Sequence, residues 1–190
     1  MKKTFFITLL AVFIFQNSLS QEKTDLNVDN EKIEKLKKIK LSFGTNIIDN
    51  SNGNQMFWRA THYEFKSPVF ISIEYDISSA IAIALTNSIN IFEIDGDDLH
   101  FFGVDFEVKY FFPIYPEITN VDFYFGIGSG QHFVGDNNAL TFNLSAGINY
   151  WTSNHIGLTF NAFAKAAITD PVPEVRNFYQ YNLGLIYKFK

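Results

Sequence analysis

The chain contains no cysteine, which excludes disulfide bonds, thiolate-ligated metal sites and a lipid-modified N-terminal cysteine. Charged residues make up only 18% of the 190 residues, and acidic residues outnumber basic ones, for a formal net charge of −5. This acidic balance argues against nucleic-acid binding. Beyond residue 38 no segment shows the apolar period of an amphipathic helix. The length is suited to a single folded domain.

Aromatic residues are abundant, at 17% of the chain, and 22 residues are phenylalanine. The mean hydropathy is nevertheless zero, so polar and apolar residues must be finely interleaved.

The first twenty residues have the three parts of a secretory signal peptide. Lys2 and Lys3 form a basic start, Phe5 to Phe15 form a short apolar segment, and Ser18-Leu19-Ser20 supplies small residues before Gln21. The alternative is an N-terminal membrane anchor, for which the apolar segment is too short. We therefore expect residues 1–20 to be removed after export, and residues 21–37, which are highly charged, to form a periplasmic tail.

Residues 38–190 alternate between apolar and polar side chains, the period-two pattern of a β-strand. In the segment 101–112, Phe102, Val104, Phe106 and Val108 oppose Gly103, Asp105, Glu107 and Lys109, whereas Phe101 and Phe111 break the pattern. The predicted strands are residues 39–48, 69–75, 80–87, 101–112, 121–130, 140–150, 156–165 and 179–190. Runs of about ten residues suit tilted strands that cross a hydrocarbon layer about 25 Å thick.

The connections predict an all-β, eight-stranded, antiparallel up-and-down transmembrane barrel. Three connections are short or turn-like, at residues 76–79, 113–120 and 151–154; four are mostly longer, at 49–68, 88–100, 131–138 and 167–175. Short turns on one side and longer loops on the other are typical of outer-membrane barrels, with both chain ends in the periplasm.

A water-soluble barrel with its apolar face inward is the alternative fold. The interior of an eight-stranded barrel is only just wide enough to be filled by side chains. The Phe-, Ile- and Leu-rich face is too bulky for that space, whereas the face of Gly, Ala, Ser, Thr and Asn fits it. A soluble barrel would also carry many Lys and Glu residues outside, which this pattern lacks.

The polar face therefore predicts a filled lumen that contains a balanced set of charges. Four lysines oppose four carboxylates, which we expect to form a paired network because an unpaired buried charge is costly. The eight residues are Lys40, Glu74, Asp105, Glu107, Lys109, Asp122, Lys165 and Lys188. A narrow ion path through this network is the functional alternative.

Aromatic residues recur where the even-numbered predicted strands reach the periplasmic end. We expect them to form a girdle at the boundary between lipid and water. The girdle residues are Tyr75, Tyr110, Phe112, Tyr150 and Trp151, with Tyr187 and Phe189 of the last strand.

The last strand, YQYNLGLIYKFK, resembles the C-terminal targeting signal of bacterial outer-membrane barrels. Its polar Asn182, Gly184 and the aromatic Tyr187 and Phe189 carry the likeness, although Lys190 follows where many such signals end on the aromatic residue. The strand segment resembles the small outer-membrane β-barrel family, similar to the transmembrane domain of OmpA-like proteins. The phrases TNIIDN, PVFISIEYDIS and GVDFEVKYFF look like barrel proteins of Bacteroidota.

Chemical motifs are weak by comparison. Some small outer-membrane barrels modify lipids with a His, a Ser and an acid at the lipid-facing rim, but strand parity places His100 and His132 on opposite faces. We interpret His62, His100, His132 and His155 as exposed loop or interface residues. The acidic segment 93–98 (EIDGDD) fits an ordinary turn better than a Ca²⁺ loop. No catalytic, cofactor-binding or metal site is predicted.

The sequence thus indicates a non-enzymatic outer-membrane protein that supports the envelope or makes surface contacts through its external loops. The first of these loops is unusually aromatic, with Met56, Phe57, Trp58, Tyr63 and Phe65. A narrow channel and a lipid-modifying enzyme remain the two alternatives. The expected partners are outer-membrane lipid or lipopolysaccharide and, during biogenesis, the barrel assembly machinery, and we expect a monomer.

Overall fold

The computed structural model describes residues 38–49, 63–64, 66–94, 97–112, 120–169 and 177–189. The predicted signal peptide (1–20), the predicted periplasmic tail (21–37), His62 and most of the aromatic first loop lie outside these residues.

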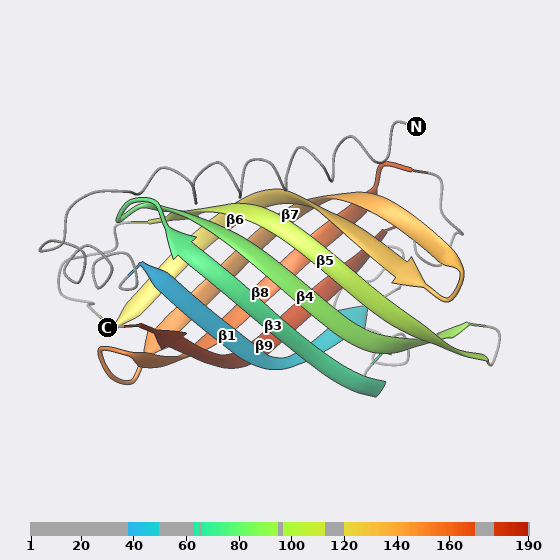
Figure 1. The fold of residues 1–190 in the computed structure, drawn as a ribbon, viewed down its shortest axis with the longest axis horizontal. Helices are drawn as coiled ribbons and strands as arrows, with labels where there is room; N and C mark the ends of the chain where they lie inside the picture. Colours follow the sequence, from blue (N-terminus) through green and yellow to red (C-terminus); the bar gives the residue numbers. More distant parts are fainter. Residues whose placement is uncertain are drawn as a thin grey trace, which may run out of the picture. The chain divides into compact units, whose positions relative to one another are not determined.

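Every regular element in the described part of the chain is a β-strand (Figure 1). The strands are β1 (Ile39–Asp49), β2 (Tyr63–Glu64), β3 (Lys66–Asp76), β4 (Ile81–Ile94), β5 (Asp97–Phe111), β6 (Val121–Val134), β7 (Asn137–Trp151), β8 (Ile156–Ala167) and β9 (Asn177–Lys188). None of the described segments forms a helix long and apolar enough to cross a membrane.

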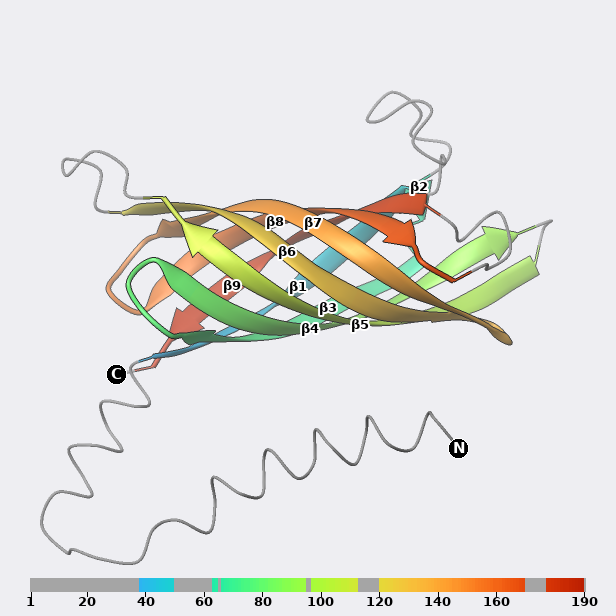
Figure 2. The ribbon, with the colours of Figure 1, turned by 90° about the horizontal axis from the view of Figure 1, so that it is seen from above.

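Eight long strands close into a barrel in which all neighbours are antiparallel. Each long strand pairs with the next along the chain, and β9 pairs back with β1 from Lys40–Lys188 to Asp49–Tyr179. The two-residue β2 extends the pairing of β1 beyond the point where β3 leaves it. Figure 2 shows β1 and β9 side by side at this closure. The predicted eight-stranded up-and-down barrel is therefore confirmed.

The register fixes the stagger of the barrel. Paired residues traced from Ile39 through β3, β4 and each following strand lead back to β1 at Asp49, ten residues further on. A stagger of this kind forces the strands to tilt by about 40° from the barrel axis. Side chains that lie far apart in sequence therefore share a level inside the barrel.

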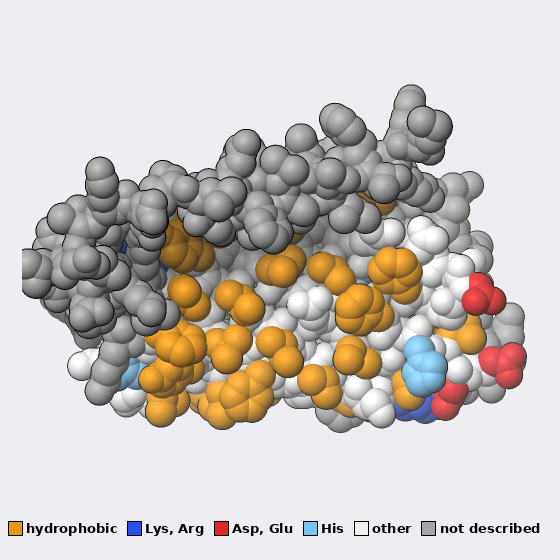
Figure 3. Space-filling view, viewed as in Figure 1, with side chains coloured by type: hydrophobic (Ala, Val, Ile, Leu, Met, Phe, Trp, Pro, Cys, Tyr) orange, Lys and Arg blue, Asp and Glu red, His pale blue; other side chains and the backbone are white. Residues whose placement is uncertain are grey.

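Large apolar side chains point outward along every long strand. The exposed fraction is 60% for Phe125, 55% for Leu183 and 52% for Leu144, although none of these lies in a loop. Figure 3 shows such side chains spread over the visible strands, with the described charges gathered near one end. Large apolar side chains thus lie on the outside of the barrel, whereas polar residues of the same strands, such as Asp105 and Asn143, are buried.

Two described turns at one end of the barrel are both stabilised by a serine side chain. In the β3–β4 turn the Ser78 hydroxyl oxygen accepts hydrogen bonds from the backbone N–H groups of Ala80 and Ile81, at 3.2 and 3.0 Å. In the β7–β8 turn Ser153 accepts from His155 and Ile156 in the same way, at 3.3 and 3.0 Å. Serine favours tight turns because its side chain replaces a backbone acceptor.

At the opposite end, two connections that the sequence predicts to be longer loops are tight hairpins. In place of a loop at 88–100, β4 and β5 stay paired up to Ile94–Asp97; in place of a loop at 131–138, β6 and β7 stay paired up to Val134–Asn137. Gly135 has φ +54°, a left-handed conformation that glycine adopts at little cost. The prediction failed because the outward positions of these extensions include polar residues, which interrupt the apolar alternation while pairing continues.

Candidate functional site

Charged side chains form two networks inside the barrel. The first lies in its lower half, near the serine turns, and is a chain of five charged residues. Lys40 Nζ lies 2.7 Å from Glu74 Oε1, and Lys109 Nζ lies 2.8 Å from Glu74 Oε2. Lys109 also lies 3.2 Å from Glu107, and Lys40 lies 2.7 Å from Asp76, which the predicted network had omitted. Glu74 thus joins two lysines, and all four predicted members of this chain are buried. We call it the lower network.

Two aromatic rings lie against the lysines of the lower network. Lys40 Nζ lies 4.7 Å from the centre of the Phe111 ring, and Lys109 Nζ lies 4.5 Å from the centre of the Tyr124 ring. Both distances are within the range of cation–π attraction. Phe111 and Tyr124 pack together with Ala82 as a buried cluster. Phe111, an exception to the predicted alternation, thus points inward and belongs to this buried cluster.

The upper network is centred on Asp105. Its Oδ2 lies 2.6 Å from Lys165 Nζ, and its Oδ1 accepts a hydrogen bond from Asn143 Nδ2 at 2.8 Å and lies 3.0 Å from His132 Nε2. Lys165 in turn donates to the side-chain oxygen Oε1 of Gln180 at 2.8 Å. Asp105 and His132 are completely buried. A buried carboxylate with three polar partners is well compensated for its loss of water.

His132 corrects the expectation that the histidines are exposed. Its ring stacks on Phe101 at 5.6 Å and meets Phe178 edge-on at 5.2 Å. His132 Nδ1 is buried without a hydrogen-bond partner among the described residues. Burying a ring nitrogen that carries no proton costs less free energy than burying an N–H group without an acceptor. We therefore assign the ring proton to Nε2, which then donates a hydrogen bond to Asp105. His132 is a lumen residue because the β6 pairing continues past residue 130.

The other histidines fit the expected pattern where the structure describes them. His100 is exposed on the outward face of β5, so His100 and His132 do lie on opposite faces. His155 lies in the β7–β8 turn, with Nδ1 3.1 Å from the carbonyl oxygen of Lys188. No Ser–His pair faces the outside of the barrel in the described strands.

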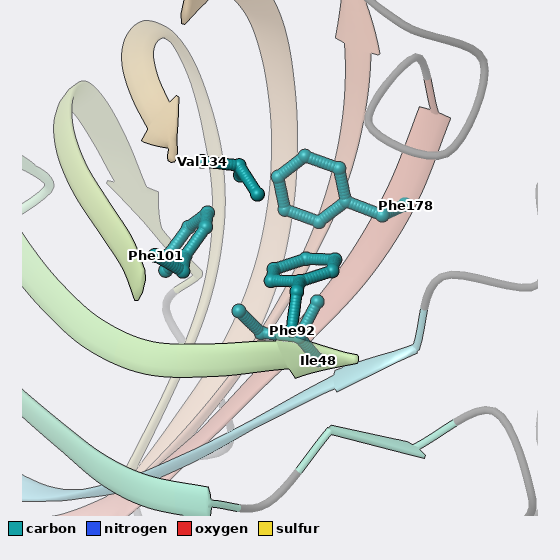
Figure 4. Close-up of a cluster of buried hydrophobic side chains, with 5 residues drawn as sticks. All are labelled: Ile48, Phe92, Phe101, Val134 and Phe178. Carbon is teal, nitrogen blue, oxygen red and sulfur yellow. The ribbon is translucent and has the colours of Figure 1, made fainter. Parts of the chain in front are cut away.

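A cluster of apolar side chains closes the lumen above the upper network, and we call it the upper plug. Its buried members are Ile48, Phe92, Phe101, Val134 and Phe178. Figure 4 shows these five side chains converging from five strands on one point inside the barrel. Phe92 and Phe101 lie 5.3 Å apart between ring centres, and Phe178 meets both edge-on. Sequence reasoning missed this plug, although the position of Phe101 out of phase in its strand was a usable signal.

The two remaining predicted charges lie near the lower mouth and make none of the ion pairs of the two networks. Asp122 is half-buried, and its Oδ2 accepts a hydrogen bond from Trp151 Nε1 at 2.6 Å. Lys188 is half-buried and sits opposite Lys40 in the β1–β9 pairing. Of the eight predicted residues, the structure therefore joins six in ion pairs and places Asp122 and Lys188 at the rim.

The predicted girdle residues gather at the lower end, with one correction. Tyr110, Phe112 and Tyr150 point outward, and Phe112 meets the rings of Tyr110 and Phe125 edge-on at 5.2 Å. Trp151, in contrast, has the strand parity of the lumen face and bonds to Asp122. Because β7 continues one residue past Tyr150 and successive strand side chains point to opposite faces, Trp151 points to the lumen side. We call the Trp151–Asp122 pair the lid of the lower mouth.

Tyr75 completes the girdle as a half-buried residue near the end of β3, opposite Ile39. In the last strand, Tyr187 points outward and meets Phe189 edge-on at 5.1 Å, while Asn182 is buried in the lumen. Gly184 pairs with Gly44 across the β1–β9 closure, where a side chain on either would collide with backbone. Gly184, one of the C-terminal residues singled out in the sequence, therefore allows the two closing strands to approach closely.

The two ends of the acidic segment lie in the paired strands β4 and β5. Glu93 pairs with Asp98 across β4 and β5, and Asp98 makes an exposed ion pair with Lys66 at 2.7 Å. Exposed pairs of this kind contribute little to stability.

Comparisons with known proteins identify the fold. No protein-family model and no curated protein sequence matches the chain. Among solved structures, the chain is similar to the outer-membrane protein OprG of Pseudomonas aeruginosa (13% identity, TM-score 0.56, covering 80% of this chain and 95% of that one). It is also similar to Neisserial surface protein A (16% identity, TM-score 0.55, 80% and 96%) and to the N-terminal β-barrel domain of Pseudomonas aeruginosa OprF (12% identity, TM-score 0.51, 78% and 96%). At these identities the likeness concerns the fold, and the chain has the fold of the closed, eight-stranded antiparallel barrels of bacterial outer membranes.

Proposed function

We propose that the protein is an integral protein of the bacterial outer membrane, exported by the signal peptide at residues 1–20. The observation that best supports this proposal is the apolar character of the outer surface of the closed barrel. Phe43, Ile73, Phe125, Leu144 and Leu183 each expose more than half of their side chain. An apolar surface that encircles a barrel is far larger than the patches that soluble monomers expose. In hydrocarbon the same surface is favourable, and the closed strand pairing satisfies the backbone.

The proposed role is structural support or surface contact, without catalysis. The upper plug, the two networks and the Trp151–Asp122 pair occupy successive levels of the described barrel interior. The contacts would then be made by the external hairpins and loops, with lipopolysaccharide and outer-membrane lipid as neighbours. The barrel assembly machinery is the expected partner during biogenesis, on the strength of the C-terminal strand.

The location is tested by fractionation of cells that express the full chain, combined with gel electrophoresis with and without boiling. We expect the folded protein in the outer-membrane fraction, with an altered mobility that boiling abolishes. Recovery of the protein in the soluble periplasmic fraction would refute the proposal.

The two alternatives are tested separately. A channel would produce single-channel steps when the refolded barrel is inserted into a planar lipid bilayer; we expect none, because the upper plug and the lower network both obstruct the lumen. A lipid-modifying enzyme would change the lipid A profile of the cell when the gene is deleted; we expect the profile to be unchanged. His132 and Asp105 face the sealed lumen, where a lipid cannot reach them.

A further inference from the structure

We propose that the lumen contains a specific binding site for one water molecule, which joins the lower and upper networks into a single hydrogen-bonded core. The site is a small cavity between them, lined by polar side chains from β1, β3, β4, β5, β6, β8 and β9. The lining residues are Ser42, Phe70, Ser72, Thr86, Lys109, Tyr124, Thr159, Asn161 and Asn182.

The size of the cavity matches a single water molecule. The space within it that the centre of a water molecule can occupy is about 10 Å³. A cavity needs roughly this much room to hold one water, together with two to four polar partners. A larger solute does not fit, and the Lys109 ammonium in the wall disfavours a cation.

Two buried polar atoms in the cavity wall supply the chemical reason for the site. The side-chain oxygen of Asn161 is buried without a hydrogen-bond partner among the described residues, and the buried Tyr124 hydroxyl has no acceptor for its proton there. Tyr124 is 2% exposed and Asn161 is 6% exposed. Leaving such a group unpaired costs about 1–3 kcal/mol. One water can accept from the tyrosine hydroxyl and donate to the asparagine oxygen, and so satisfy both.

The same cavity lies where the hydrogen bonds of the barrel interior are interrupted. On one side, Lys109 belongs to the lower network and contacts the Tyr124 ring. On the other side, Asn182 accepts a hydrogen bond from Gln180 at 2.8 Å, and Gln180 accepts from Lys165 of the upper network. Water in the cavity would complete a path of polar contacts between the two networks. The upper plug ends this path, so we assign the water a structural role.

A direct test is a crystal structure of the mature protein, purified from outer membranes, at a resolution that shows ordered water. We expect a density peak within hydrogen-bond distance of both Tyr124 Oη and Asn161 Oδ1. The proposal is overturned if the cavity is empty, or if the two side chains have turned to bond with protein groups.

A second test counts long-lived water in solution by oxygen-17 magnetic relaxation dispersion of the detergent-solubilised protein. Asn161→Leu replaces the asparagine amide with an apolar group of similar size and should reduce the count by one. Tyr124→Phe removes only one partner and should shorten the residence time. Tyr150→Phe, which removes a hydroxyl on the outer surface, is the matched control and should change neither quantity. An equal count in the native protein and in folded Asn161→Leu would refute the site; folding is verified by gel mobility.

Discussion

Neutralising Asp105 should destabilise the barrel strongly, because this carboxylate compensates the buried charge of Lys165. The two groups lie 2.6 Å apart, and both side chains are completely inaccessible to water. Asp105→Asn keeps the size of the side chain but leaves the Lys165 ammonium beside neutral groups, the Gln180 side-chain oxygen at 2.8 Å and His132 Nε2 at 3.2 Å. Breaking a buried ion pair by removing one partner costs about 3–5 kcal/mol. We expect the free energy of unfolding to fall by this amount.

The pair can be separated from its surroundings by a double-mutant cycle. Lys165→Met alone should also be destabilising, because it leaves the Asp105 carboxylate with only Asn143 and His132. The double variant Asp105→Asn/Lys165→Met should recover much of the loss, because replacing both buried charges with neutral groups is often nearly neutral.

The measurement is reversible urea unfolding of the refolded protein in lipid vesicles, followed by tryptophan fluorescence and gel mobility. The reasoning would be refuted if Asp105→Asn lowered the free energy of unfolding by less than about 1 kcal/mol, the range of a solvent-exposed pair. Strict additivity of the two single effects in the double variant would equally contradict it.

Three further predictions use the same unfolding assay. Leu144→Arg, at the centre of β7 on the outer face, should cost about 2–4 kcal/mol, whereas Leu144→Ile should cost far less; equal costs would contradict the assigned face. Gly147→Val should impair folding because its side chain would collide with the ring of Tyr124, which lies over this glycine, and Tyr124→Ala in the same chain should relieve the collision. Trp151→Phe should lower the free energy of unfolding by about 1 kcal/mol, because it removes the hydrogen bond to Asp122. An unchanged free energy of unfolding would show that this hydrogen bond does not stabilise the barrel.

The fold could be predicted because its signal repeats in every strand. Alternation with period two, together with the volume argument, determines both the strand class and the outward face. The outward position of Leu144 and the inward position of Asn143 follow from this parity alone. The extended hairpins β4–β5 and β6–β7 could not be predicted in this way, because outside the apolar band the outward residues no longer need to be apolar.

The lumen could be predicted only in its composition. The sequence shows that charges of both signs face inward, but which lysine meets which carboxylate depends on the stagger of the strands. Lys165 and Asp105 lie 60 residues apart and meet only through the register of four strands. The roles of Phe101, Phe111 and His132 were missed for a related reason: each occupies an inward position at which the pattern alone suggested an irregularity or a loop.

The central claim is that the apolar face of the barrel meets hydrocarbon. It is tested most directly by nuclear magnetic resonance of the native protein in lipid nanodiscs, through magnetisation transfer from lipid acyl chains to protein methyl groups. Methyl groups of Ile73, Leu144 and Leu185 should show strong transfer, and those of Ala82, Ala84 and Ile186 inside the barrel should show none. Strong transfer to the inner set and none to the outer set would contradict the account.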